Sequence, residues 1–368
     1  MLHAGFFAPH KITDTQVYER YGDAIVDGQV PYRDFGVEYP PAALPVFVVP
    51  ELVGDDFRAS FEGLMAGLGV GVVLLVGLAG PWWAPIFVGI SPLLLGSVVL
   101  TRFDLWPVAL AGAALALFLG GRSRLALGFL GVASAAKVYP ALFAPILLAH
   151  VWKTRGRREA LVCGGLFLGA VAAVVLPFAL VSPGGVWDAF RTQAGRPLQI
   201  ESLGAALLLA GHHVLGLDLT MESSHGSQNL TGGGADAIAA LSSLLQAAAV
   251  VAVWIWYARG PAGRDRLLRA CAAAVCAFIA FGKVLSPQFL LWLIPLVPLV
   301  RGRRGLLASG VLALALVLTQ LWFPRRYWEL ALEFDGPASG ILLLRDLTLI
   351  ALLAVLTLRV PGERARSS

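Results

Sequence analysis

Charged and amide side chains recur within the apolar sequence of this 368-residue chain, where an ionised group is costly unless it has a partner or a function. They lie in four short segments: TRFDLWP (101–107), SAAKVYP (134–140), RPLQIES (196–202) and GKVLSPQF (282–289). The candidate side chains in these segments are Arg102, Asp104, Lys137, Arg196, Gln199, Glu201, Lys283 and Gln288. Carboxylates can accept protons and cations can bind phosphate, so this mixture suits a transfer reaction on a phosphorylated substrate.

The first 38 residues carry many carboxylates among aromatic rings. The acids are Asp14, Glu19, Asp23, Asp27, Asp34 and Glu38, and the rings in and beside this segment are Tyr18, Tyr21, Tyr32, Phe35 and Tyr39. Acids alone would indicate a solvated face, but aromatic residues at this density favour an ordered, packed segment. Rings of this kind also occur in sugar-binding sites.

Two of these features have a simpler alternative explanation. Arg102 and Asp104 could pair with each other at the end of a helix, and Lys283 could extend to the membrane interface as an anchor. The sequence leaves both alternatives open.

Familiar cofactor and nucleophile motifs were not found. There is no HxxxH spacing, no GxxxxGK[ST] loop and no GxSxG turn, so we expect neither a metal nor another cofactor. The cysteines Cys163, Cys271 and Cys276 all lie in apolar runs, where a thiol behaves as a small buried hydrophobe.

The elements that must position these residues are membrane helices. The chain is 58% hydrophobic and 14% charged, which excludes an ordinary soluble domain. Because a membrane-spanning helix needs about 20 apolar residues, the sequence predicts an all-α, polytopic transmembrane helix bundle with about 9–11 membrane segments. The expected spans are 59–79, 86–100, 105–120, 160–181, 236–258, 268–284, 287–300, 306–322 and 341–359, with interfacial helices at 39–53.

Basic clusters predict the orientation of the bundle. Residues 122–124 (RSR) and 153–158 (KTRGRR) flank an apolar stretch, so 125–150 must be a hairpin if both clusters face the cytoplasm. Further arginines near 259–269, 301–304 and 359–366 then also face the cytoplasm, and the candidate side chains gather on the outer face. This distribution accounts for the net charge of +5 without a nucleic-acid partner.

This topology divides the chain into three parts. Residues 1–58 form an outer acidic loop with juxtamembrane helices, 59–359 form the transmembrane bundle with its 125–150 hairpin, and 360–368 form a cytoplasmic tail. No apolar helix precedes the acidic loop to carry it across the membrane, so we expect the native gene product to have another helix before Met1.

Several blocks of sequence resemble one known family. ITDTQVYERYGDAI, GQVPYRDFGVEYPPAALPVFVVP, AAKVYPALFAP, RPLQIES and SPQFLLWLIPL are similar to the polytopic mannosyltransferases of glycosyltransferase family 87, in the GT-C superfamily. The resemblance implies metal-independent, inverting transfer of mannose, or in some members arabinose, from a polyprenyl-phosphate donor. The acceptor would be a glycolipid or polysaccharide of the cell envelope at the outer face of the cell membrane.

The resemblance also implies roles for individual residues. The catalytic carboxylate of the superfamily lies in the first outer loop, and Asp14 is the matching position; Asp23, Asp34 and Glu38 remain competitors for the base. The other expected substrate-binding residues are Tyr18, Arg33, Asp34, Glu38, Arg102, Asp104, Lys137, Arg196, Gln199, Glu201, Lys283 and Gln288.

Two classes of protein rival this interpretation. A transporter or flippase for lipid-linked sugars would also need charges within the membrane, but no internal repeat pairs the two halves of the chain. A noncatalytic partner of envelope-assembly enzymes is the third possibility.

Overall fold

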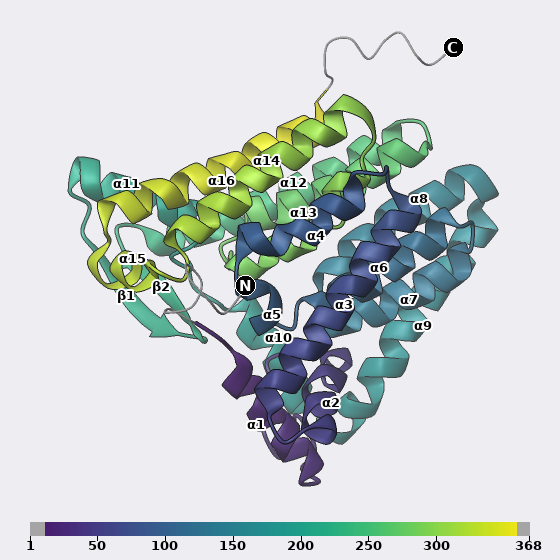
Figure 1. Ribbon diagram of the computed structural model, residues 1–368, viewed down its shortest axis with the longest axis horizontal. Helices are drawn as coiled ribbons and strands as arrows, with labels where there is room; N and C mark the ends of the chain where they lie inside the picture. Colours follow the sequence, from purple (N-terminus) through teal and green to yellow (C-terminus); the bar gives the residue numbers. More distant parts are fainter. Residues whose placement is uncertain (1–11, 359–368) are drawn as a thin grey trace. The chain divides into compact units, whose positions relative to one another are not determined.

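The computed structural model describes residues 12–358, which form an all-α helix bundle of the polytopic membrane type (Figure 1). The predicted cytoplasmic tail, 360–368, lies outside the described residues. The chain divides into two compact units. The first unit comprises Met1–Ala79 and Gly96–Arg196, and the second comprises Gly80–Leu95 and Pro197–Ser368.

The first unit is built on a row of helices in which α3 packs on α6, α6 on α7, and α7 on α9. Short helices at the amino-terminal end, α1 and α2, pack against each other and against α3. The elements are α1 (Thr15–Val26), η2 (Pro41–Ala43), α2 (Pro45–Val53), α3 (Phe57–Ala79), α5 (Val98–Thr101), α6 (Leu105–Leu119), α7 (Ser123–Ala136), η3 (Tyr139–Phe143), α8 (Ala144–Arg155), α9 (Arg157–Val181) and α10 (Pro183–Ala194).

The chain reverses between α7 and α8. Helix α7 ends at Ala136 and a 3₁₀ turn begins at Tyr139, where Pro140 provides no N–H to extend the α-helix. The end of α8 returns to the start of α7, and Arg155 Nη2 donates to the Gly121 carbonyl at 2.8 Å. The two basic clusters that flank the hairpin are therefore neighbours, and Arg124 also pairs with Glu159 at 2.7 Å.

The second unit packs α16 against α14, α13 and α11, while α12 packs on α13 and α4 on α14. Its elements are α4 (Ala84–Leu95), α11 (Leu203–Leu215), β1 (Leu219–Ser224), β2 (Ser227–Gly232), α12 (Ala235–Arg259), α13 (Arg264–Ala280), η4 (Pro287–Trp292), η5 (Val297–Leu299), α14 (Gly302–Trp322), α15 (Tyr327–Glu333) and α16 (Gly336–Thr357).

Five of the described helices are long and apolar enough to cross a membrane: α3, α9, α12, α14 and α16. Each begins and ends within a few residues of a predicted span. The predicted span at 86–100 is instead divided into α4 and α5, because Gly96 adopts a positive φ of 82° between them.

The predicted span at 287–300 is a buried run of 3₁₀ turns rather than a regular α-helix. Pro287, Pro295 and Pro298 each lack the N–H that an α-helical hydrogen bond requires. Residues 290–300 are all buried, and irregular backbone at membrane depth is tolerated where protein surrounds it.

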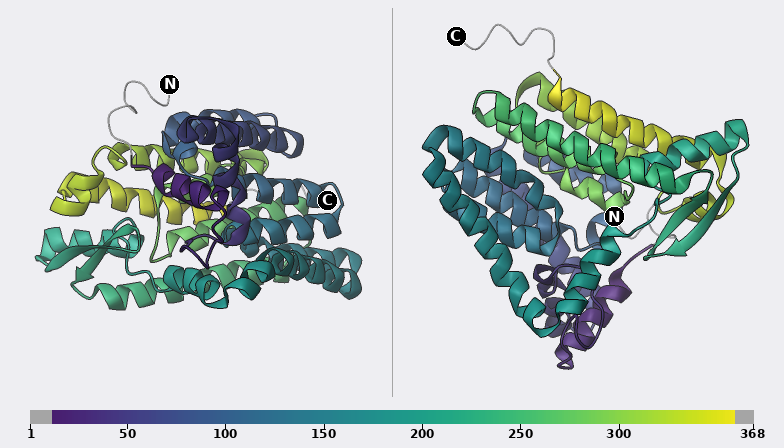
Figure 2. Two further views of the ribbon diagram at one scale, coloured as in Figure 1. Left: turned by 90° about the horizontal axis from the view of Figure 1, so that it is seen from below. Right: turned by 180° about the vertical axis from the view of Figure 1, so that it is seen from behind.

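A two-stranded antiparallel hairpin, β1–β2, lies between α11 and α12 and was not predicted (Figure 1 and Figure 2). The loop before α11 continues the hairpin's hydrogen bonding: Ile200 N donates to Gln228 O at 3.0 Å, and Leu230 N donates to Leu198 O at 2.9 Å. The hairpin therefore holds residues 198–200 in an extended conformation next to β2.

Basic helix ends also meet within the second unit. The backbone N–H of Arg301, at the start of α14, donates to Asp265 in the first turn of α13 at 3.2 Å. Arg269 Nε of α13 donates to Leu356 O, near the end of α16, at 2.9 Å. The amino-terminal ends of α13 and α14 therefore lie beside the carboxyl-terminal end of α16, where the sequence predicts cytoplasmic loops.

Candidate functional site

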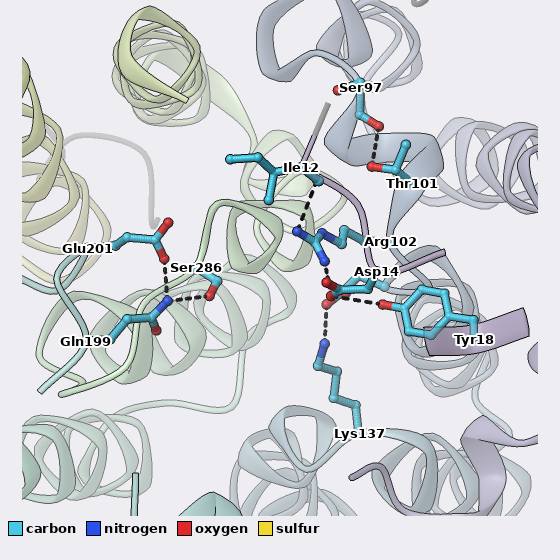
Figure 3. Close-up of polar contacts among 11 residues, drawn as sticks. Ile12, Asp14, Tyr18, Ser97, Thr101, Arg102, Lys137, Gln199, Glu201 and Ser286 are labelled. Atoms are coloured by element: carbon cyan, nitrogen blue, oxygen red, sulfur yellow. Dashed lines mark hydrogen bonds and ion pairs between the residues drawn. The ribbon is translucent and has the colours of Figure 1, made fainter. Parts of the chain in front are cut away.

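Two carboxylates and two cations lie together in the first unit (Figure 3). Arg102, at the end of α5, forms an ion pair with Asp14 through Nη1 and donates through Nη2 to the Ile12 carbonyl at 3.3 Å. Lys137, at the end of α7, forms an ion pair with Asp104 at 2.6 Å between Nζ and Oδ1. The loop between α5 and α6 thus places Arg102 beside the Asp14 carboxylate and Asp104 beside the Lys137 ammonium.

This pairing differs from the simpler alternative that Arg102 and Asp104 neutralise each other. The structure gives each of these two charges a partner from a different part of the chain. Asp104 precedes α6, whereas Lys137 follows α7, and these two helices pack side by side. Lys137 Nζ also lies 4.6 Å from the centre of the Phe103 ring, a cation–π distance.

The two carboxylates differ in their access to solvent. The Asp104 side chain is 1% exposed, whereas that of Asp14 is 34% exposed, and the Arg102 side chain that pairs with Asp14 is 7% exposed. A substrate could therefore reach Asp14 more easily than Asp104, which is enclosed with its lysine. Asp104 is suited to holding Lys137, and Asp14 is suited to contacting a reactant.

Aromatic rings support this cluster from the side of α1 and α2. Tyr18 stacks on Phe47 with ring centres 4.9 Å apart and meets Phe103 edge-on at 5.7 Å. Its hydroxyl lies 3.4 Å from an Asp14 carboxylate oxygen. Burial raises the pKa of Tyr18 well above its ordinary value, with added repulsion from Tyr39 and Asp104, so the phenol remains a neutral donor to Asp14.

The acidic motif YRDFGVE forms a separate surface turn. Arg33 donates through Nε and Nη2 to the two oxygens of the neighbouring Asp34, and the Val30 N–H also donates to Asp34. These hydrogen bonds, from Arg33 above all, lower the pKa of Asp34 to about 2. Glu38 is exposed, and its backbone carbonyl faces Gln193 of α10. These side-chain contacts of Arg33 and Asp34 are thus local and Glu38 meets α10, whereas the charge cluster is built from Asp14, Arg102, Asp104 and Lys137.

Arg196 ends the first unit and lies near the cluster. It is half-buried, and its charge acts on the Lys137 ammonium, as does that of Arg102. Three cations, Arg102, Lys137 and Arg196, therefore lie in the same part of the first unit as Asp14 and Asp104. Cations of this kind can bind an anion such as phosphate.

The second unit holds a polar group of its own around residue 199. Gln199 Nε2 donates to the Glu201 carboxylate and to Ser286 Oγ, the latter at 2.9 Å (Figure 3). The Gln199 N–H also donates to the Lys283 carbonyl at 2.9 Å. The RPLQIES and GKVLSPQF segments, which the sequence singles out separately, are therefore in contact, and Gln288 lies half-exposed in η4.

One ionic pair in the second unit escaped the sequence reasoning. Arg345 and Asp346 lie in the middle of α16, both with fully buried side chains, and Arg345 Nε is 2.8 Å from Asp346 Oδ1. The signal was visible as the charged dipeptide in LLLRDLTL, within a predicted span, where an ionisable residue indicates a function or a specific partner.

Metal ligands do not cluster in the part of the chain that the structure describes. Among residues 12–358, no group of three or more His, Cys, Asp or Glu side chains could hold a metal ion. The arrangement offers carboxylates for proton transfer and cations for binding an anion.

The fold and these charge clusters define a polytopic membrane protein whose polar groups suit transfer chemistry. The profile of glycosyltransferase family 87 matches residues 38–287, and the chain belongs to this family. It is therefore a membrane glycosyltransferase. A comparison with curated proteins gives no significant match.

The family match includes most, but not all, of the candidate residues. Arg102, Asp104, Lys137 and the RPLQIES segment lie within it, whereas Asp14 precedes its first residue. The argument for Asp14 therefore depends on its contacts with Arg102 and Tyr18.

Proposed function

We propose that this glycosyltransferase takes a sugar, most simply mannose, from a polyprenyl-phosphate donor and transfers it to a glycolipid or polysaccharide acceptor of the cell envelope. The observation that carries the proposal is the accessible Asp14 carboxylate beside a group of buried and half-buried cations. Arabinose is the alternative sugar that the family resemblance allows.

The proposed reaction is a direct displacement at the anomeric carbon of the donor. Asp14 accepts the proton of an acceptor hydroxyl as the new bond from oxygen to the anomeric carbon forms. The bond from that carbon to the phosphate oxygen breaks, and its electron pair leaves on the polyprenyl phosphate. Cations placed before the reaction stabilise this developing charge, which is the main requirement for such a leaving group.

Individual residues have distinct roles in this proposal. Arg102 orients Asp14 through their ion pair, while Tyr18 donates a hydrogen bond to the same carboxylate. Lys137 and Arg196 bind the donor phosphate, and Asp104 holds Lys137 in position. In the second unit, Gln199, Glu201, Lys283 and Gln288 contact substrate. Arg33, Asp34 and Glu38 contact the acceptor at the surface of the outer segment.

We place this chemistry at the outer face of the cell membrane. Arg155 lies beside Gly121 at one end of the α7–α8 hairpin, whereas Lys137 lies at the turn of the hairpin. If the basic end faces the cytoplasm, the turn and its charge cluster face outward. The same topology makes 1–58 an outer loop and 59–359 the transmembrane bundle.

Labelled polyprenyl-phosphate sugars test the proposal. Proteoliposomes containing the purified protein receive a mannose or an arabinose donor on the external side, together with an envelope glycolipid extract. We expect the label to appear on the acceptor with one of the two donors. Movement of intact donor across the bilayer without transfer would instead support a flippase, and neither transfer nor movement would contradict the proposed donor class.

A further inference from the structure

The Arg345 guanidinium links the middle of α16 to the loop that precedes α11. Its Nη2 donates to the Glu201 backbone carbonyl at 2.7 Å, and its Nε lies 2.8 Å from Asp346 Oδ1. The guanidinium carbon, Cζ, lies 5.6 Å from the centre of the Trp322 ring. One side chain therefore joins three structures: α16, α14 and the loop at residues 198–202, here named the 198–202 loop.

The position of Arg345 is costly for a charge. It lies nine residues after Gly336, where α16 begins, or about 14 Å along the helix axis. Its side chain is fully buried, as is that of Asp346, so neither group reaches an aqueous interface. Buried ion pairs can often be replaced by apolar residues without loss of stability, so a fold has little need for this one.

The 198–202 loop is also held by backbone hydrogen bonds to other segments of the second unit. Strand β2 pairs with Leu198 and Ile200, and the Lys283 carbonyl accepts the Gln199 N–H. Glu201 directly precedes Ser202, whose Oγ caps α11 by accepting from the Ala205 N–H. Arg345 fixes the Glu201 backbone between these anchors, while the Glu201 carboxylate accepts from Gln199 Nε2.

We infer that Arg345 is a positioning residue that holds the 198–202 loop, and with it the buried Gln199 and Glu201, in the arrangement that transfer requires. This inference rests on the proposed function for the role of Gln199 and Glu201. Asp346 supports it as an ion-pair partner, with Oδ1 2.8 Å from Arg345 Nε. Two nitrogens of one side chain thus serve two partners, which a single lysine nitrogen cannot do in the same geometry.

Two variants separate this role from simple structural support. Arg345→Met combined with Asp346→Leu removes both buried charges together, and Arg345→Lys retains the charge but not the two-point contact. Arg269→Met is the matched control, because Arg269 also donates from a helix to a backbone carbonyl, at 2.9 Å to Leu356. All three proteins are first compared with the wild type for membrane insertion and for thermal unfolding in detergent.

Hydrogen exchange followed by mass spectrometry reads the loop directly. Backbone N–H groups in peptides covering 198–205 should exchange at least about 10-fold faster in both Arg345 variants, and at the wild-type rate in Arg269→Met. Unchanged exchange in the Arg345 variants would overturn the anchoring role. If the double variant fails to insert, Arg345→Lys alone decides the question.

Kinetics then test whether the anchor matters for transfer. We expect kcat/KM to fall about 10- to 100-fold in both Arg345 variants at near-normal thermal stability, the scale expected for a misplaced contact, and to change little in Arg269→Met. Full activity in a stable Arg345 variant would overturn the positioning role. A wild type without transfer would instead contradict the proposed function, and the exchange measurement would still decide the anchoring.

Discussion

Asp104→Asn removes the negative charge that faces Lys137 while leaving the shape of the side chain almost unchanged. The two charged atoms lie 2.6 Å apart, and the Asp104 and Lys137 side chains are 1% and 15% exposed. At an effective dielectric constant of about 20, their attraction amounts to about 6 kcal/mol. Part of this offsets the cost of removing both charges from water, so the expected net loss of stability is about 3–5 kcal/mol.

A buried thiol provides the assay. Cys163 lies in α9 of the first unit and has no exposed surface, so a thiol-reactive fluorophore reports unfolding there once Cys271 and Cys276 are replaced by Ala. In detergent, Asp104→Asn should lower the Tm by roughly 6–20 °C relative to the same background.

The matched control removes both charges. Asp104→Asn combined with Lys137→Met leaves no uncompensated ammonium, and it should recover most of the lost stability. A Tm for Asp104→Asn within about 2 °C of the parent would refute the reasoning, as would a double variant that is no more stable than the single one.

Three further predictions follow from the same geometry. Cysteines introduced at the exposed Glu222 and Glu333 should react with a membrane-impermeant thiol reagent in intact cells, and one at Arg303 should not; the reverse pattern would invert the proposed orientation. Lys283→Met should raise the KM for donor at least about 10-fold without affecting insertion, and unchanged donor kinetics would restore the snorkelling explanation. Because the folded-state pKa of Asp34 is lowered to about 2, its ionic contribution is present above about pH 4 and is lost only as the pH falls through about 2. If the transfer rate falls as the pH is lowered from 7 to 4, the same fall should therefore persist in Asp34→Asn. Its disappearance in this variant would contradict the low pKa of Asp34.

The long helices could be predicted because apolar length alone defines them. The helices α3, α9, α12, α14 and α16 each lie close to a predicted span, since a run of about 20 apolar residues has few alternatives to a membrane helix. Proline-rich residues 287–300 showed the limit of this rule. Hydropathy specified where the segment lies but not that its backbone would form 3₁₀ turns.

The ion pairs between charged residues could not be predicted from the sequence as well as the long helices. The sequence leaves open whether Arg102 pairs with Asp104, and it does not show that helix packing places Asp14 beside Arg102 and Lys137 beside Asp104. Average hydropathy does not single out Arg345, because apolar residues surround it on both sides in α16. The β1–β2 hairpin was missed because its polar strands carry only a weak alternation of apolar residues.

The central claim is that Asp14 accepts the acceptor proton in transfer from a polyprenyl-phosphate sugar. The most direct measurement is the rate of label transfer by purified wild type and by Asp14→Asn, at equal amounts of inserted protein and with the same donor and acceptor. The amide keeps the shape of the side chain but cannot take the proton, so the account predicts a fall in turnover of about 100-fold or more, with wild-type expression. Near-normal turnover in Asp14→Asn, together with loss of transfer in Asp34→Asn or Glu38→Gln, would contradict the claim and assign the base to the other residue.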